Sequence, residues 1–237
     1  MITRRSKLNP GGLNTVAFSL AIIQRKLTKL SQDPIFFVRD ILEDGNNLTP
    51  AQLDAIQAIH DNNKIMVVAN SKTGLTSLSL AYILWFALTH PNKNILLLGP
   101  SHQYIVFMCN IVYQMFITLP QWVKDHYVCV EHHTSTKLEF SNATTIQGCK
   151  CDRSAARGKT TDLVFWDEYN LIHLDPRRDV LLDILFSSVR SGEEGKVICG
   201  YSTPNIEESI EGLKYESPAK SFIHHVLPRA EDMTWVA

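Results

Sequence analysis

The stretch VVANSKTGLTS at residues 67–77 contains the feature that decides the fold. Apolar residues at 65–69 predict a short buried strand, a polar turn follows at 70–74, and the apolar segment at 75–89 predicts a helix. Where a strand gives way to a helix in this manner, backbone N–H groups and the helix N-terminus can surround a phosphate. We therefore expect a phosphate-binding loop at this turn.

The segments that follow repeat the alternation of strand and helix. Further strands are predicted at 94–98, 162–166 and 196–201, and further helices at 103–118 and 177–189. Three short candidate strands at 127–131, 137–140 and 144–148 are separated by polar turns and predict an antiparallel insertion. The whole pattern predicts an α/β fold with a mainly parallel sheet flanked by helices.

The N-terminal part of the chain precedes this pattern. We expect residues 1–14 to be a flexible leader, and apolar spacing predicts a helix at 15–30 and a second one at 33–42. Thr49 is suited to cap a helix that starts at Pro50. We divide the chain into an N-terminal arm or helix at 1–32 and a main domain at 33–237.

Composition indicates a folded globular protein. Of 237 residues, 45% are hydrophobic and 20% are charged, and the formal net charge is −1, which gives no global electrostatic reason for nucleic-acid binding. The five cysteines contain no CxxC pair, so reduced thiols are the expectation. No signal peptide or membrane-spanning run is recognisable, and we expect a soluble cytoplasmic protein.

The loop departs from the pattern G-x-x-x-x-G-K-[ST] in two places, because Asn70 replaces the first glycine and Leu75 replaces the lysine. Lys72 either turns back over the phosphates to supply the missing charge or is a solvated loop lysine. Thr76 either ligates Mg²⁺ or is an ordinary residue of the first helical turn. The residues predicted to hold the nucleotide phosphates are Ser71, Lys72, Thr73, Gly74, Leu75, Thr76 and Ser77.

A pair of carboxylates ends the predicted strand at 162–166. In the Walker B arrangement Asp167 would position Mg²⁺ and Glu168 would polarise the attacking water. The alternative is a polar loop after a strand. The position of the pair downstream of a candidate phosphate loop favours the catalytic interpretation.

Two other segments have residues suited to nucleotide chemistry. Ser202 and Thr203 follow the strand at 196–201, where their hydroxyls can sense a γ-phosphate, although a Pro-containing turn is the simpler reading. Arg157 lies in a turn before the carboxylates, where a guanidinium can stabilise transition-state charge as an arginine finger. A surface or DNA-contacting arginine is its alternative.

Taken in order, these segments resemble the large terminase family of tailed bacteriophages from about Asp33 to the end of the chain. SKTGLT at 71–76 resembles the family's S-R-Q-x-G-K-T loop, and LTPAQ at 48–52 resembles its adenine-recognition segment, in which Gln52 would read the base. The remaining matches are DPIFF at 33–37, the N-G-S turn at 142–144, the arginine motif at 156–158, Walker B at 166–168 and the coupling motif at 202–205.

The resemblance implies a phosphate-loop NTPase of the additional-strand type that hydrolyses ATP with Mg²⁺ and moves double-stranded DNA into a procapsid. It further implies a ring, of five subunits, that docks on the portal protein and engages a small terminase subunit, with Arg157 acting across a subunit boundary. The place of work would be the host cytoplasm and, transiently, the procapsid. The family's C-terminal nuclease domain is expected to be missing from this chain.

Two departures from the family keep other functions open. Leu75 stands at the family's lysine and Ala143 at the glycine of its N-G-S turn. One alternative is a helicase-like nucleic-acid translocase, with which Gln52, the loop and the Asp167–Glu168 pair are compatible. The other is a degenerate module that binds nucleotide weakly or not at all and serves in assembly.

Overall fold

The protein is described by a computed structural model for residues 10–42, 47–127, 130–150, 160–171, 189, 195–204, 206 and 222–227. Its helices are α1 (Pro10–Gln32), α2 (Pro34–Asp40), α3 (Pro50–Asp61), α4 (Leu75–Thr89), α5 (His102–Thr118), α6 (Gln121–His126) and the 3-10 turn η2 (Tyr169–Leu171). Its strands are β1 (Lys64–Asn70), β2 (Asn94–Gly99), β3 (Val130–Thr134), β4 (Lys137–Phe140), β5 (Thr145–Lys150), β6 (Leu163–Trp166), β7 (Lys196–Thr203) and β8 (Ile223–Leu227).

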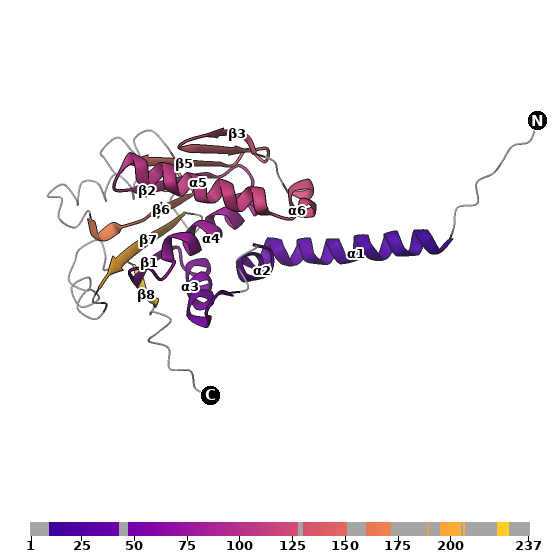
Figure 1. Ribbon diagram of the computed structural model, residues 1–237, viewed down its shortest axis with the longest axis horizontal. Coiled ribbons are helices and arrows are strands. Elements are labelled where there is room, and N and C mark those ends of the chain that lie inside the picture. Colours follow the sequence, from indigo (N-terminus) through magenta and orange to yellow (C-terminus); the bar gives the residue numbers. More distant parts are fainter. Residues whose placement is uncertain are drawn as a thin grey trace, which may run out of the picture.

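The strands form one sheet in the order β3-β4-β5-β2-β6-β7-β1-β8. Strand β7 pairs in parallel with both β1 and β6, so it lies between the strand before the phosphate loop and the strand before the carboxylates. This is the additional strand that the family resemblance implied. The α/β fold with a mainly parallel sheet flanked by helices is confirmed (Figure 1).

The predicted antiparallel arrangement of β3, β4 and β5 is confirmed, because β4 pairs antiparallel with both β3 and β5. β5 pairs antiparallel with β4 and parallel with β2, so it belongs to the main sheet. β5 also packs against α5. A Cβ at Gly148 would come within 2.2 Å of Cγ2 of Ile105, so the bare glycine is what lets α5 lie directly on this strand.

Helix α4 is buried on almost all sides, which explains why its sequence is apolar all round rather than on one face. It packs against α2, α3 and α5. Its C-terminal end is held by the turn at 142–144, where the amide of Asn142 donates to the carbonyl of Ala87 at 2.9 Å. Ala143 in this turn adopts a left-handed φ of 64°, the conformation that the family's glycine would adopt without strain.

The N-terminal helix differs from the expectation. α1 begins at Pro10, so the predicted flexible leader at 1–14 is wrong for residues 10–14; proline is well suited to the first turn of a helix. α1 runs outward from the body (Figure 1), and its C-terminal end is attached where the indole of Trp85 donates to the carbonyl of Leu30 at 2.7 Å. Among the described helices, none has the length and apolar character needed to cross a membrane.

Candidate nucleotide site

The predicted phosphate loop connects the end of β1 to the start of α4 through two residues with left-handed backbones. Lys72 has a φ of 70° and Gly74, the N-cap of α4, has a φ of 79°. No side chain caps the N-terminus of α4, so the first N–H groups of a fifteen-residue helix are left for a ligand. An uncapped helix N-terminus with a positive dipole end is suited to an anion such as phosphate.

The loop is braced from helix α3. Gln52 donates from Nε2 to the carbonyl of Thr73 at 3.0 Å, while its Oε1 accepts from the backbone N–H of Thr49 at 2.9 Å. The predicted base-reading residue is therefore part of the capping box of α3 and of the loop support at the same time.

Asp167 and Thr76, the two residues predicted to hold Mg²⁺, lie in contact. The hydroxyl of Thr76 donates to Oδ2 of Asp167 at 2.6 Å, although 91 residues separate the two in the chain. Tyr104 on α5 also donates to this oxygen, at 2.7 Å. Sequence reasoning missed Tyr104. Nothing in the local sequence indicates that a tyrosine in the first turn of a helix will contact a carboxylate that follows a strand much later in the chain.

Strand β7 leaves space for the carboxylate. A Cβ at Gly200 would lie 2.6 Å from Oδ1 of Asp167, so a side chain here would displace it. Oδ1 accepts from the backbone N–H of Glu168 at 3.1 Å, and Glu168 has a left-handed φ of 54°. A strained backbone persists only where the surrounding structure holds it in place, and such residues are common at functional sites.

The two carboxyl groups have environments that oppose ionisation. Burial raises the pKa of Asp167, against the opposing effect of the hydrogen bonds from Thr76 and Tyr104. The pKa of Glu168 is raised by burial first and by the charge of Asp167 second. A raised pKa brings a carboxylate closer to the range in which a general base works at neutral pH.

The residues present fit a magnesium ion of the kind that binds together with a nucleotide. Within the described ranges, no cluster of three His, Cys, Asp or Glu side chains is placed to hold a metal. Mg²⁺ in nucleotide enzymes is held by one or two protein oxygens, with phosphates and water completing the shell. The buried carboxylate of Asp167 and the hydroxyl of Thr76 supply that set.

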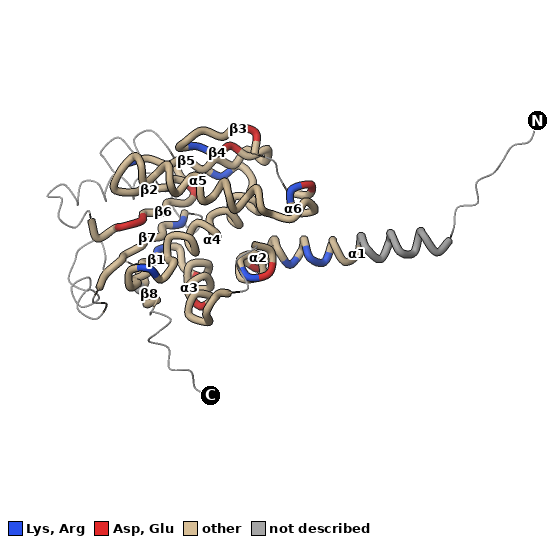
Figure 2. Tube along the Cα trace, viewed as in Figure 1, with Lys and Arg blue, Asp and Glu red and all other residues tan. Residues whose placement is uncertain are grey.

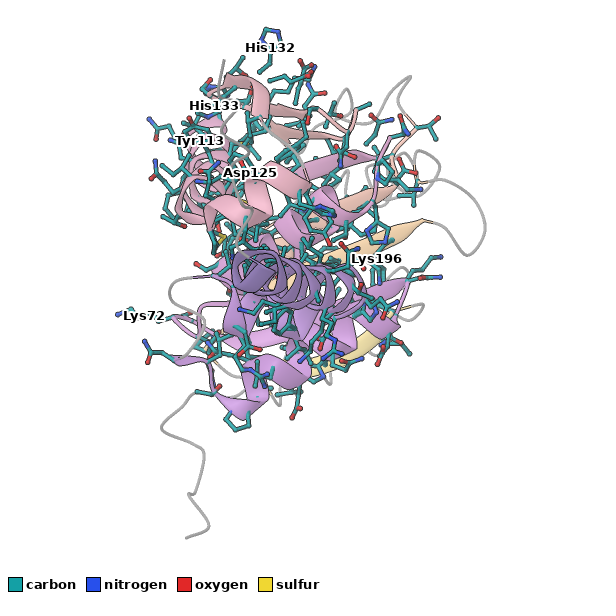
Figure 3. The ribbon with its side chains drawn as sticks, turned by 90° about the vertical axis from the view of Figure 1, so that its right-hand side faces the viewer. Lys72, Tyr113, Asp125, His132, His133 and Lys196 are labelled. Carbon is teal, nitrogen blue, oxygen red and sulfur yellow. The ribbon has the colours of Figure 1, made fainter. Side chains whose placement is uncertain are left out.

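Lys72 and Leu75 divide the loop into an exposed and a buried part. Figure 3 shows the side chain of Lys72 extending away from the body, and within the described residues no carboxylate pairs with it. Leu75 is only 4% exposed. Its Cδ2 would lie 3.5 Å from a Cβ at Gly200, so the side chain at the usual lysine position is directed toward β7, beside Asp167.

A cavity of about 580 Å³ opens beside the loop, between α2, α4 and α5. It reaches the loop at Gly74 and Ser77, and Gln52 lies in its wall. Phe107 is 52% exposed in the same wall. The remaining lining residues are Val38, Leu42, Leu48, Leu78, Ala81, Asn110, Ile111, Gln114, Met115 and Thr118. Such a mainly apolar pocket with a few amides is the usual form of a small-molecule site.

The other predicted site residues are placed in part. Ser202 and Thr203 pair in register with Ala69 and Asn70, so they flank the start of the phosphate loop at the carboxyl edge of the sheet. Ser71 is exposed on the loop. Arg157, Asn205 and the helix predicted at 177–189, except residue 189, lie outside the described residues.

The fold is similar to solved ATPase domains of bacteriophage large terminases. The HK97 large terminase aligns with 87% of this chain and 45% of its own, at 16% identity and a TM-score of 0.60. The ATPase domain of the Thermus phage P74-26 large terminase aligns with 74% of this chain and 70% of its own, at 16% identity and a TM-score of 0.53. At such identity the likeness shows the fold, which is that of a phosphate-loop NTPase.

A third similar structure holds a nucleotide analogue. The large terminase of a thermophilic bacteriophage, solved in complex with ATP-γ-S, aligns with 76% of this chain and 44% of its own, at 16% identity and a TM-score of 0.52. This chain thus spans less than half of that protein and of the HK97 protein. No protein-family model matches the sequence, and no curated protein matches it significantly.

Proposed function

We propose that this chain is the ATP-hydrolysing motor domain of a viral DNA-packaging terminase. The observation that carries the proposal is the 2.6 Å hydrogen bond from Thr76 to Asp167, which joins the phosphate loop to the end of β6 with Glu168 next in the chain. A fold shared with phage terminases, one of them solved with ATP-γ-S, supports it. The nucleotide is therefore proposed to be ATP.

The proposed chemistry assigns one task to each part of the site. The N–H groups at the start of α4 bind the phosphates, and Thr76 and Asp167 hold the Mg²⁺ that neutralises charge on them. Glu168 orients a water and accepts its proton as the water oxygen bonds to the γ-phosphorus. The bond between that phosphorus and the bridging oxygen breaks, so that ADP leaves. Ser202 and Thr203 are proposed to sense the γ-phosphate.

The cavity beside the loop is proposed to hold the nucleoside. It begins at Gly74 and Ser77, where the phosphates would end, and its apolar wall suits a purine ring. Phe107 offers an exposed ring on which a base can stack. Gln52 is proposed to contact the base with the second N–H of its amide, because the first is donated to Thr73.

Lys72 and Arg157 are proposed to supply the positive charge that Leu75 lacks. Lys72 is exposed beside the loop and unpaired within the described residues, so its ammonium is available to the β- and γ-phosphates. Arg157 is proposed to act as the arginine finger, in its own site or that of a neighbouring subunit.

Coupling to DNA is proposed to need several copies of the chain. In the view of Figure 2, Lys and Arg are scattered over the described residues and interspersed with Asp and Glu, and the net charge is −1. A monomer is therefore expected to bind double-stranded DNA weakly, and a ring, proposed to have five subunits, would gather the contacts. The proposed partners are a portal protein and a small terminase subunit, and the proposed location is the host cytoplasm and, transiently, the procapsid.

One observation favours a second candidate, a nucleotide-binding module without hydrolysis. Leu75 is part of the buried core at the position where the lysine of such loops normally meets phosphate. If Lys72 does not replace that lysine, the domain binds nucleotide weakly and serves in assembly.

The test is steady-state ATP hydrolysis with Mg²⁺ over a range of protein concentrations. We expect Glu168→Ala to lower kcat by about 10²–10⁴-fold, as loss of a general base does, and Lys72→Ala to lower kcat/KM. Glu131→Ala, an exposed carboxylate on β3, is the matched control and should change neither. Hydrolysis by the unmodified chain no faster than by Glu168→Ala would reject the motor and leave the second candidate.

A further inference from the structure

Tyr104 is held in place by two features outside the proposed nucleotide-binding set. Its backbone N–H is capped by the hydroxyl of Ser101, at 3.2 Å, at the start of α5. Its ring lies over the end of β2, where a Cβ at Gly99 would come within 2.8 Å of Cδ1. The half-buried phenol is therefore fixed by a helix N-terminus on one side and a bare glycine on the other.

The phenol oxygen completes a triangle of three oxygens. It lies 2.7 Å from Oδ2 of Asp167 and 3.4 Å from Oγ1 of Thr76, and these two are themselves 2.6 Å apart. Separations of 2.6 and 2.7 Å are those of strong O–H···O hydrogen bonds. Oδ2 of Asp167 is therefore held by two hydroxyl groups, one from the loop and one from α5.

We propose that Tyr104 is a positioning residue for the metal site, whose O–H holds the carboxylate of Asp167 in the orientation that receives Mg²⁺. The proposal rests on the proposed function, because it assigns a role within the same site. Thr76 and Tyr104 both donate to Oδ2, so the plane of the carboxylate is fixed from two sides. A phenylalanine would fill the same space and leave Asp167 with one of these two donors.

The experiment measures metal affinity directly. Mn²⁺ binding to the full chain is titrated by electron paramagnetic resonance, with and without ADP, for the unmodified chain and for Tyr104→Phe. We expect Mn²⁺ affinity to fall by about 10-fold or more, as the loss of an outer-shell partner does, while ADP affinity without metal stays within about 2-fold. In hydrolysis assays, the Mg²⁺ concentration for half-maximal rate should rise, and kcat at saturating Mg²⁺ should recover.

Two further variants separate positioning from folding. Tyr113→Phe is the matched control, because Tyr113 is on the same helix but stacks on His133, with ring centroids 3.9 Å apart (Figure 3). It should leave Mn²⁺ affinity unchanged. Gly99→Ala keeps the phenol but pushes its ring away from β2, so it should weaken Mn²⁺ binding as Tyr104→Phe does.

The outcomes distinguish this inference from the proposed function. Unchanged or tighter Mn²⁺ binding in Tyr104→Phe would overturn the positioning role, even if the unmodified chain hydrolyses ATP normally. Absence of ADP binding in the unmodified chain would count against the proposed function instead, and the positioning role, which rests on that function, would fall with it.

Discussion

The side-chain amide of Gln52 donates a 3.0 Å hydrogen bond to the carbonyl of Thr73, so helix α3 is tied to the phosphate loop across 21 residues of chain. The oxygen of the same amide accepts from the backbone N–H of Thr49 at the start of α3. One side chain therefore caps a helix and supports the loop, and the two roles can be separated by substitution.

We predict that Gln52→Glu weakens nucleotide binding without unfolding the domain. Glutamate keeps the capping box but cannot donate to Thr73. We expect the affinity for ATP-γ-S to fall by about 10-fold, equivalent to about 1.4 kcal/mol, and the free energy of unfolding to change by less than about 1 kcal/mol. Calorimetric titration and urea unfolding measure the two effects.

The control for this prediction is Thr49→Ala. It removes the side-chain cap of α3 and leaves the hydrogen bond from the Gln52 amide to the carbonyl of Thr73. It should lower the free energy of unfolding by about 1 kcal/mol and leave nucleotide affinity nearly unchanged. Equal nucleotide affinities in Gln52→Glu and the unmodified chain, at both low and high salt, would contradict the bracing role.

A double substitution tests whether Lys72 replaces the missing lysine. In the unmodified chain, Lys72→Ala should weaken ATP-γ-S binding by about 10-fold or more, because a charge-assisted bond to phosphate is lost. In a Leu75→Lys background the same change should cost less than about 3-fold, since the second ammonium would meet the phosphates. Leu75→Met is the neutral control. Additive effects would contradict the replacement, because Lys72 would then act independently of the residue at position 75. No loss of affinity in Lys72→Ala alone would show that Lys72 binds no phosphate.

Ala143 is predicted to be a strained residue. At its φ of 64° an alanine pays a steric cost that glycine does not. Ala143→Gly should therefore raise the free energy of unfolding by about 1 kcal/mol. Ala58→Gly, inside helix α3, should lower it by about 1 kcal/mol. Urea unfolding compares the two, and destabilisation by both would refute the prediction.

Lys196 is predicted to make stability depend on pH. Its ammonium donates to the carbonyls of Ile59 and Asn62, both at 2.6 Å, and burial lowers its pKa from 10.5 to about 8. Between these two values the unfolded chain binds the proton and the folded chain does not, so the free energy of unfolding rises with pH. Below about pH 8 this contribution is flat.

The measurement is urea unfolding between pH 7.5 and 10.5, compared with Lys196→Met. The difference between the two proteins should change in favour of the unmodified chain, by about 1–3 kcal/mol, as pH rises through this window. Any other group that titrates in this pH range contributes to both proteins, so it cancels in the difference between them. A pH-independent difference would mean that Lys196 keeps an ordinary pKa.

Sequence patterns placed the central strands and helices well, because their ends are fixed by local chemistry. Gly74 and Ser101 mark helix starts by conformation and side-chain capping, and β1 and β6 are short apolar runs buried on both faces. The pairing of β5 with β2, and the existence of β8, depend on contacts between distant segments. A local pattern has no information about these.

The candidate site divides in the same way. Thr76 and Asp167 could be named from motifs, and the structure places them in contact. Tyr104 and Gly200 could not, because their importance lies in close approaches to Asp167, which is far from both in the chain. The packing of Leu75 toward β7 could not be predicted either. A motif shows that leucine replaces the lysine, but not where the leucine side chain packs.

The position of β7 also determines the order in which the site can form during synthesis. β1 pairs only with β7 and β8 within the described sheet, and both follow it late in the chain. The phosphate loop is therefore made before either neighbour of β1, and β1 has no strand partner until residues 196–203 have emerged. Until then both edges of β1 are unpaired, and they can form hydrogen bonds with strands of other chains. The phosphate loop is thus translated well before the strand that completes the nucleotide site.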